Sequence, residues 1–105
     1  MLFEVEKSVR SSRDIEEAFV YIAEDNLDSG VYFLVAVEDS LDLLAENPFL
    51  GYEKAFKNSK LSGLRVWRVK GFNSYVLIYL VDKQARRLRL MRLINSKRDF
   101  DKIEI

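Results

Sequence analysis

Cysteine and histidine are both missing from the 105-residue sequence, which also has only one proline. Without cysteine the chain cannot form a disulfide, a thiolate nucleophile or a cysteine-ligated zinc site. Without histidine it lacks the commonest general base and metal ligand of proteins. Catalytic triads and zinc-protease chemistry are therefore excluded, and we expect neither a metal site nor a cofactor.

Long apolar segments are missing as well. No apolar run exceeds seven residues, whereas a helix that crosses a bilayer needs about 20. Glu4 and Glu6 interrupt the start of the chain, so the pattern of a secretion signal is not met. A chain of this length buries roughly two-thirds of its unfolded surface, which is enough for one core. We expect a cytoplasmic protein without membrane contact, in which residues 1–105 form a single domain.

Charge is balanced overall but segregated along the chain. Lys and Arg number 17, as do Asp and Glu, yet residues 1–48 hold three basic and twelve acidic side chains. Residues 65–98 hold ten basic side chains and a single acidic one, Asp82. This asymmetry suggests an anionic partner for the second half. The alternative is that acidic helices dock on a basic sheet and the two neutralise each other.

Apolar residues recur at helical spacing in two segments of the first half. Ser11 and Asp14 resemble a capping box, so a first helix is expected to begin there. Asp28 is placed to cap a second helix, which Asn47-Pro48 should end. The two apolar stripes are Ile15, Ala18, Phe19, Ile22 and Phe33, Leu34, Val37, Leu41, Leu44. Two amphipathic helices joined by a short break predict an antiparallel hairpin.

Three stretches rich in β-branched, aromatic and aliphatic residues follow, at 64–69, 73–81 and 87–95. The middle stretch is apolar on both faces, which is typical of a central strand. Arginines within the last stretch indicate exposure there. Because residues 3–6 alternate like a strand, the sequence predicts an α+β fold. An N-terminal strand and a two-helix antiparallel hairpin would pack on one face of an antiparallel β-meander.

This order of elements resembles the ParE/RelE toxins of bacterial type II toxin-antitoxin systems over nearly the whole chain. The segments that carry the resemblance are Asp14–Glu24, Leu43–Pro48 with Gly51, Gly63–Arg65, Val69–Phe72, Tyr75–Tyr79 and Met91–Asp99. Asn95 stands where many members have histidine. The resemblance is closest to the ParE branch, and it implies a toxin neutralised by a cognate antitoxin, a hetero-oligomer with that antitoxin and a role in plasmid stabilization.

The family has a ribonuclease branch, which cuts mRNA on the ribosome, and the ParE branch, which poisons DNA gyrase. RNA cleavage requires a base, a cation and an acid. Arg65, Arg92 and Arg98 would supply the cations, but arginine stays protonated and cannot act as the base. A catalytic tyrosine of the ribonuclease branch has no counterpart in residues 100–105, and a neutral protein competes poorly for RNA. We therefore favour a gyrase inhibitor without catalytic residues over an endoribonuclease.

Two surfaces are expected to carry the interactions. The predicted target-binding residues are Arg89, Arg92, Lys97 and Arg98, because a solvated strand and tail present charge without a pocket. The alternative for Arg98 is a surface ion pair with Glu17 or Glu24.

An apolar groove for the antitoxin is expected to be marked by Trp67, Phe72 and Tyr75. The alternative for Trp67 is ordinary core packing. A further interpretation of the whole chain is a non-toxic relative that only binds a partner peptide.

Overall fold

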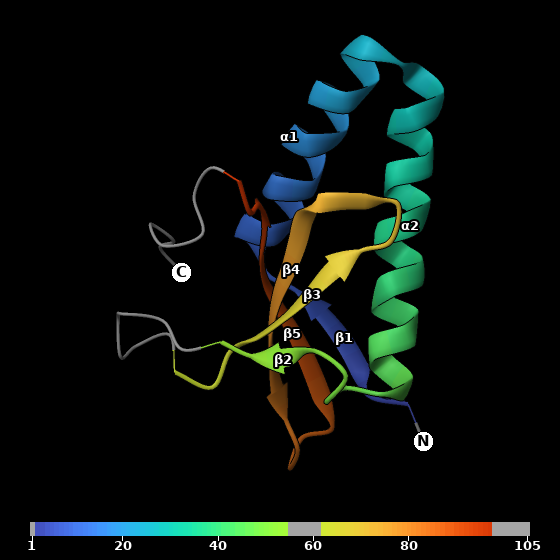
Figure 1. The fold of residues 1–105 in the computed structure, drawn as a ribbon. Helices are drawn as coiled ribbons and strands as arrows, with labels where there is room; N and C mark the ends of the chain where they lie inside the picture. The colour runs from blue at the N-terminus through green and yellow to red at the C-terminus, as the bar shows by residue number, and fades with distance from the viewer. Residues whose placement is uncertain (1, 55–61, 98–105) are drawn as a thin grey trace.

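The computed structural model describes residues 2–54 and 62–97. Figure 1 shows an α-helical hairpin beside a twisted sheet, which confirms the α+β fold predicted from the sequence. In chain order the elements are β1 (Glu4–Lys7), α1 (Val9–Asp25), α2 (Leu27–Glu46), β2 (Tyr52–Glu53), β3 (Arg65–Val69), β4 (Phe72–Asp82) and β5 (Arg87–Asn95). Neither helix is long and apolar enough to cross a membrane, within the part of the chain described.

The strands lie in the order β1-β5-β4-β3-β2. Strands β3, β4 and β5 form the predicted antiparallel meander. The sheet as a whole is mixed, because β1 runs parallel to β5. Parallel neighbours require a long connection, and here it comprises the helical hairpin and strands β2 to β4. The short strand β2 pairs antiparallel with the start of β3 and has no counterpart in the sequence prediction.

The first helix begins earlier than the sequence predicted. Ser8 is its N-cap, with an extended backbone and a side chain that accepts a hydrogen bond from the N–H of Ser11 at 3.0 Å. Ser11 itself is buried, and its hydroxyl donates to the Ser8 carbonyl. The expected capping box at Ser11 and Asp14 is therefore wrong, because Ser8 satisfies the free N–H groups of the first turn.

The break between the helices is a single residue, Asn26. Its backbone N–H donates to the Ile22 carbonyl at the end of α1, and its side chain accepts from the N–H of Ser29 at the start of α2. The predicted cap Asp28 instead lies in the first turn of α2. Its negative charge there stabilises the helix by interacting with the positive end of the helix dipole. A Cβ on Gly30 would lie 2.8 Å from Ala23 Cβ, so glycine allows the two helices to meet closely.

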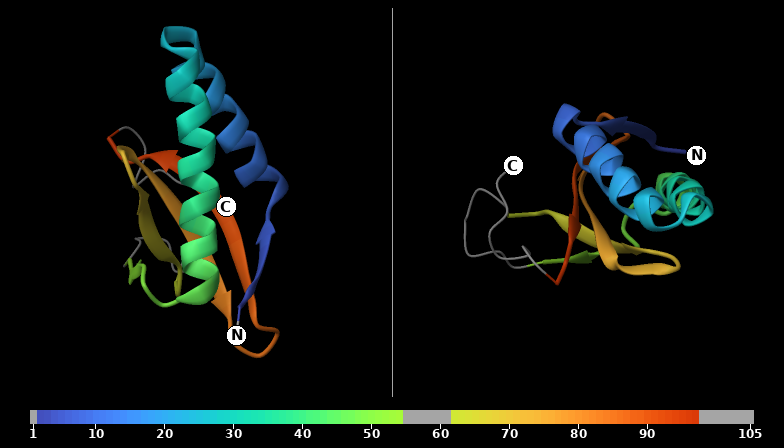
Figure 2. Two further views of the ribbon diagram at one scale, coloured as in Figure 1. Left: turned by 90° about the vertical axis from the view of Figure 1, so that its right-hand side faces the viewer. Right: turned by 90° about the horizontal axis from the view of Figure 1, so that it is seen from above.

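Both faces of β4 are buried, as expected for a central strand. On one face, Leu77 and Tyr79 pack with the apolar sides of α1 and α2, where Phe33 is fully buried. On the other face, Val76 and Ile78 belong to a second cluster with Leu64, Val66 and Ile94. Figure 2 shows that both helices lie on one side of the sheet, which places the first cluster between two layers.

The turn after α2 is held by a tyrosine from the middle of β4. The Tyr79 hydroxyl donates to the Pro48 carbonyl at 2.8 Å and accepts from the Gly51 N–H at 2.9 Å. A Cβ on Gly51 would lie 2.4 Å from that hydroxyl and 2.8 Å from the Val66 carbonyl, so only glycine fits. Burial raises the pKa of Tyr79 above its ordinary value of 10.0, against smaller lowering effects of the Gly51 N–H and Arg65.

Candidate functional site

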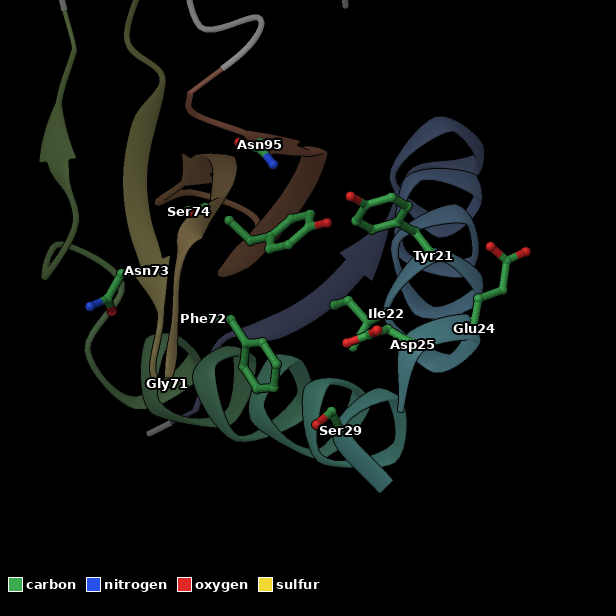
Figure 3. Close-up of a pocket in the computed structure, with 11 residues that line it drawn as sticks. Tyr21, Ile22, Glu24, Asp25, Ser29, Gly71, Phe72, Asn73, Ser74 and Asn95 are labelled. Atoms are coloured by element: carbon green, nitrogen blue, oxygen red, sulfur yellow. The ribbon is translucent and has the colours of Figure 1, made fainter. Parts of the chain in front are cut away.

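Two grooves open between the helical hairpin and the turn that joins β3 to β4. The first, which we call the α1 groove, has a volume of about 830 Å³ and lies between the hairpin and the ends of β4 and β5 (Figure 3). It is lined by Tyr21, Ile22, Glu24, Asp25 and Ser29 from the helices and by Gly71, Phe72, Asn73, Ser74, Tyr75 and Asn95 from the sheet. Its walls thus combine aromatic rings with acidic and amide side chains.

The orientation of the side chains in the α1 groove distinguishes its two carboxylates. Figure 3 shows the Asp25 carboxylate turned into the groove on the side of Phe72, whereas the Glu24 carboxylate points away from it. Tyr21 reaches across from α1 toward the strands and is 71% exposed. The described residues that line this groove include no Lys or Arg. The α1 groove is therefore acidic and aromatic.

The second groove, which we call the α2 groove, has a volume of about 580 Å³ between α2 and β3. Its lining residues are Tyr32, Val35, Ala36, Asp39, Ser40 and Leu43 on α2, with Trp67, Arg68, Lys70 and Phe72 opposite. Val35 and Leu43 are about half exposed although they are aliphatic. An exposed aliphatic stripe beside aromatic rings is typical of a protein-binding surface.

The three predicted antitoxin-binding residues are brought together around these grooves. Trp67 lines the α2 groove, Tyr75 lines the α1 groove and Phe72 lines both. Phe72 and Tyr75 also meet the buried Phe33 edge-on, at ring-centroid distances of 5.3 and 5.2 Å. Each of the three is partly buried against the core, so core packing and groove lining coexist at Trp67.

The predicted target-binding residues fall into different environments. The Arg89 side chain is 47% exposed and pairs with Glu6 at 3.2 Å, and Lys97 is exposed. Arg92 is only 11% exposed and points inward to Asp14. Arg98 lies outside the described residues.

Arg92 joins β5 to α1. Its Nε and Nη2 donate to the Asp14 carboxylate at 2.7 and 3.3 Å, and the Leu93 backbone N–H donates to the same carboxylate at 3.1 Å. Arg10, one helical turn before Asp14, approaches it at 3.6 Å. Two elements that are about 80 residues apart in the chain are thus fixed by a charge-assisted network.

Arg65, a second candidate cation for RNA cleavage, is held at the turn after α2. Its guanidinium donates to the Gly51 carbonyl at 2.6 Å and stacks on the Phe49 ring at 4.9 Å. Arg65 lies on β3 and Arg92 on β5, with β4 between them. The sheet therefore separates these two arginines by two strand spacings, roughly 10 Å.

The turn between β4 and β5 carries two cations that are not among the predicted site residues. Lys83 lies over the Phe49 ring at 5.4 Å, and Arg86, with a φ of 52°, stacks on Phe3 at 4.8 Å. Figure 1 shows this turn at the opposite end of the molecule from the joined ends of α1 and α2. The signal was present in the charge count, but the count could not show where these residues lie.

Comparison with known families agrees with this architecture. The sequence profile of the ParE toxin of type II toxin-antitoxin system, parDE, matches residues 5–100. The chain belongs to the ParE toxin family. The resemblance read from the sequence is thereby confirmed.

Among solved structures, the ParE-family chain is similar to a chain of the crystal structure of the RelBE2 toxin-antitoxin complex from Mycobacterium tuberculosis. The TM-score is 0.64 at 18% identity, over 90% of this chain and 99% of that chain. At this identity the likeness shows that the fold is shared. Comparison with curated proteins gives no match.

Proposed function

We propose that this ParE-family toxin arrests growth by acting on DNA gyrase. We further propose that a cognate antitoxin neutralises it by filling the α2 groove and covering the Phe72 side chain that lines it. The state of Arg65 and Arg92, the two candidate catalytic arginines among the described residues, carries the gyrase part of the proposal. Arg92 is bound to Asp14, and Arg65 is bound to the Gly51 carbonyl. Neither guanidinium is presented to a phosphodiester as RNA cleavage would require.

Tyr79, which like Arg65 binds Gly51, offers no alternative chemistry. The Tyr79 hydroxyl is fully buried and uses both its donor and its acceptor capacity within the turn after α2. Burial also raises its pKa, which disfavours the phenolate that a general base would need. A toxin that acts by occupying a surface of its target needs no such group.

Exposed cations on β5 and after it are suited to that kind of target. Arg89 and Lys97 are exposed, and gyrase holds DNA, whose phosphates attract cations. The acidic carboxylates Glu24, Asp25 and Asp28 lie near the joined ends of the helices. Arg89 lines neither groove, so a target contact through Arg89 and an antitoxin in the grooves would use different parts of the molecule.

The grooves support an antitoxin partner. Val35 and Leu43 expose aliphatic surface beside Trp67, and burial of such surface is worth about 25 cal/mol per Å². An amphipathic segment laid along α2 would cover this stripe. This assembly would be a hetero-oligomer of toxin and antitoxin.

The decisive experiment compares two targets side by side. Purified protein is incubated with gyrase and supercoiled plasmid and scored for cleaved complexes, and a parallel translation reaction is scored for cut mRNA. We expect cleaved plasmid with intact mRNA, and growth arrest with an SOS response on expression without an antitoxin. Cut mRNA with unaffected gyrase would assign the protein to the ribonuclease branch, and unimpaired growth despite soluble accumulation would reject toxicity.

A further inference from the structure

We propose that the α1 groove binds an arginine side chain of the partner protein, held between aromatic rings and the Asp25 carboxylate. For the identity of that partner, the antitoxin, this inference rests on the proposed function. The site itself is argued from the described residues of the groove, and it differs from the aliphatic α2 groove in both charge and composition.

Asp25 is the carboxylate that would bind the guanidinium. Its carboxylate is turned into the groove (Figure 3), and no Lys or Arg of residues 2–54 and 62–97 pairs with it. Asp14 and Glu6, in contrast, are already paired with arginines of the chain. Glu24 is unpaired like Asp25 among the described residues, but its carboxylate points away from the groove (Figure 3). Asp25 thus keeps its capacity to accept two parallel N–H bonds from a guanidinium.

Aromatic rings line the same groove as Asp25. Tyr21, Phe72 and Tyr75 line the same groove, and their rings attract a cation placed over a face. Phe72 and Tyr75 are fixed by their edge-on contacts with Phe33, so two of the three rings are held in place before a ligand arrives. A planar guanidinium stacks on such rings better than a compact ammonium, which selects arginine over lysine.

The surrounding helices are strongly acidic. Residues 9–46 contain ten acidic side chains and only two basic ones, Arg10 and Arg13. Arg13 is eight residues before Tyr21, which is about 12 Å along the helix. On the sheet side, Arg68 and Lys70 line the α2 groove, and the Arg68 guanidinium donates to the Asn73 carbonyl. The helical wall of the α1 groove therefore attracts a cationic segment, whereas a second copy approaching with its own hairpin would be repelled.

The test uses N-acetyl-arginine amide as the probe and its neutral counterpart N-acetyl-citrulline amide as the control. Two-dimensional NMR of the labelled full chain follows both titrations. We expect the arginine probe to shift the resonances of Tyr21, Asp25 and Phe72 and the citrulline probe to leave them unchanged. Equal shifts with both probes, or shifts confined to other carboxylates of the helices, would overturn the proposal.

Asp25→Asn and Glu24→Gln form a matched pair of variants, since they remove one charge each from neighbouring residues. We expect Asp25→Asn to lower the affinity for the arginine probe about fivefold, which is the effect of losing one exposed ion pair. Glu24→Gln should leave this affinity nearly unchanged. Equal effects of the two variants would show that the probe is attracted only by the overall negative charge of the helices, which would overturn the proposal. Failure of the gyrase assay would leave this result untouched, so the two proposals fail separately.

The identity of the partner is tested in the complex with the antitoxin that restores growth. Asp25→Arg should weaken that complex more than Glu24→Arg, and replacing one arginine of the antitoxin with aspartate should restore binding to the Asp25→Arg toxin. Equal affinity of both variants would overturn the antitoxin as the occupant. Self-association of the free chain that Asp25→Asn abolishes would assign the groove to a second copy instead.

Discussion

The Asp14 carboxylate on α1 accepts hydrogen bonds from Arg92 Nε at 2.7 Å and from the backbone N–H of Leu93 at 3.1 Å. The side chains of Asp14 and Arg92 are 8% and 11% exposed, so the pair is largely withdrawn from water. A carboxylate that accepts both a side-chain and a backbone donor fixes the direction as well as the distance between two elements. This contact therefore holds α1 against β5.

Arg92→Met is therefore expected to lower the free energy of unfolding by about 3 kcal/mol, because it leaves the Asp14 charge buried without its main partner. Urea denaturation followed by circular dichroism measures the change. Arg10→Met is the control, since Arg10 is 57% exposed and only 3.6 Å from the same carboxylate, and it should cost less than about 1 kcal/mol. Equal losses for the two variants would mean that the buried pair has no special role.

Arg92 also shows that counting charges along the sequence does not reveal which arginines of β5 face the solvent and which face the helices. The arginine-rich pattern of β5 predicts Arg92 as a target-binding residue. In the structure the Arg89 side chain is 47% exposed, whereas that of Arg92 is only 11% exposed. The register of β4 and β5 shifts between Ile78 and Tyr79, and such a shift changes which side chains face the helices. Its partner, Asp14, lies far away in the sequence and was mistaken for a capping residue.

The fold itself followed from local patterns. Apolar periodicity predicted both helices, and the apolar run within β4 predicted a strand buried on two faces. The parallel pairing of β1 with β5 and the two-residue strand β2 were not predictable, because both depend on contacts between distant segments. The sequence predicts only part of the α1 groove. Phe72 and Tyr75 are predicted antitoxin-binding aromatics, whereas nothing in the sequence distinguishes Asp25 from the other acidic residues of its segment.

Tyr79→Phe is expected to destabilise the protein by about 2 kcal/mol, because it leaves the buried Gly51 N–H without an acceptor. The same substitution should change how the free energy of unfolding depends on pH in the alkaline range. Burial raises the folded-state pKa of Tyr79, so the protonated phenol stabilises the fold fully below about pH 10 and this contribution is lost as the pH rises through the folded pKa.

The measurement is the difference in unfolding free energy between the wild type and Tyr79→Phe from pH 7 to pH 11. All ionisable groups other than Tyr79 are common to both proteins, so their contributions cancel in the difference. We expect the difference to be constant at neutral pH and to shrink above about pH 10. A difference that grows with pH would show that the phenolate is the form favoured by the fold.

Val35→Asp tests the α2 groove as the antitoxin surface. Val35 is 52% exposed, so the substitution should change stability by about 0.5 kcal/mol or less. An antitoxin segment that covers the groove would bury the new carboxylate without a partner, which is costly. We expect at least about tenfold weaker antitoxin binding and loss of rescue in growth assays, with toxicity retained.

Val20→Asp is the matched control for this experiment, because Val20 is an equally exposed valine, 46%, on α1 and does not line the α2 groove. It should leave antitoxin rescue intact. Loss of rescue in both variants would indicate a broad hydrophobic contact over the whole hairpin rather than binding in the α2 groove.

Arg89→Gln tests the contact between β5 and the target. Arg89 is about half exposed and paired only across the surface with Glu6, so its loss should cost less than about 1 kcal/mol of stability. If β5 is attracted to the DNA that gyrase holds, the variant should yield fewer cleaved complexes and weaker growth arrest. Raising the salt concentration should reduce the activity of the wild type more than that of the variant, because the interaction is screened.

Arg13→Gln removes the same charge from α1 and serves as the control for Arg89→Gln. Net charge falls equally in both, so a purely long-range effect would weaken both toxins to the same extent. A contact made by β5 predicts a loss only in Arg89→Gln, with antitoxin affinity unchanged because the grooves lie elsewhere. Full toxicity of a well-folded Arg89→Gln protein would remove this residue from the target surface and leave the exposed Lys97 as the cation to test next.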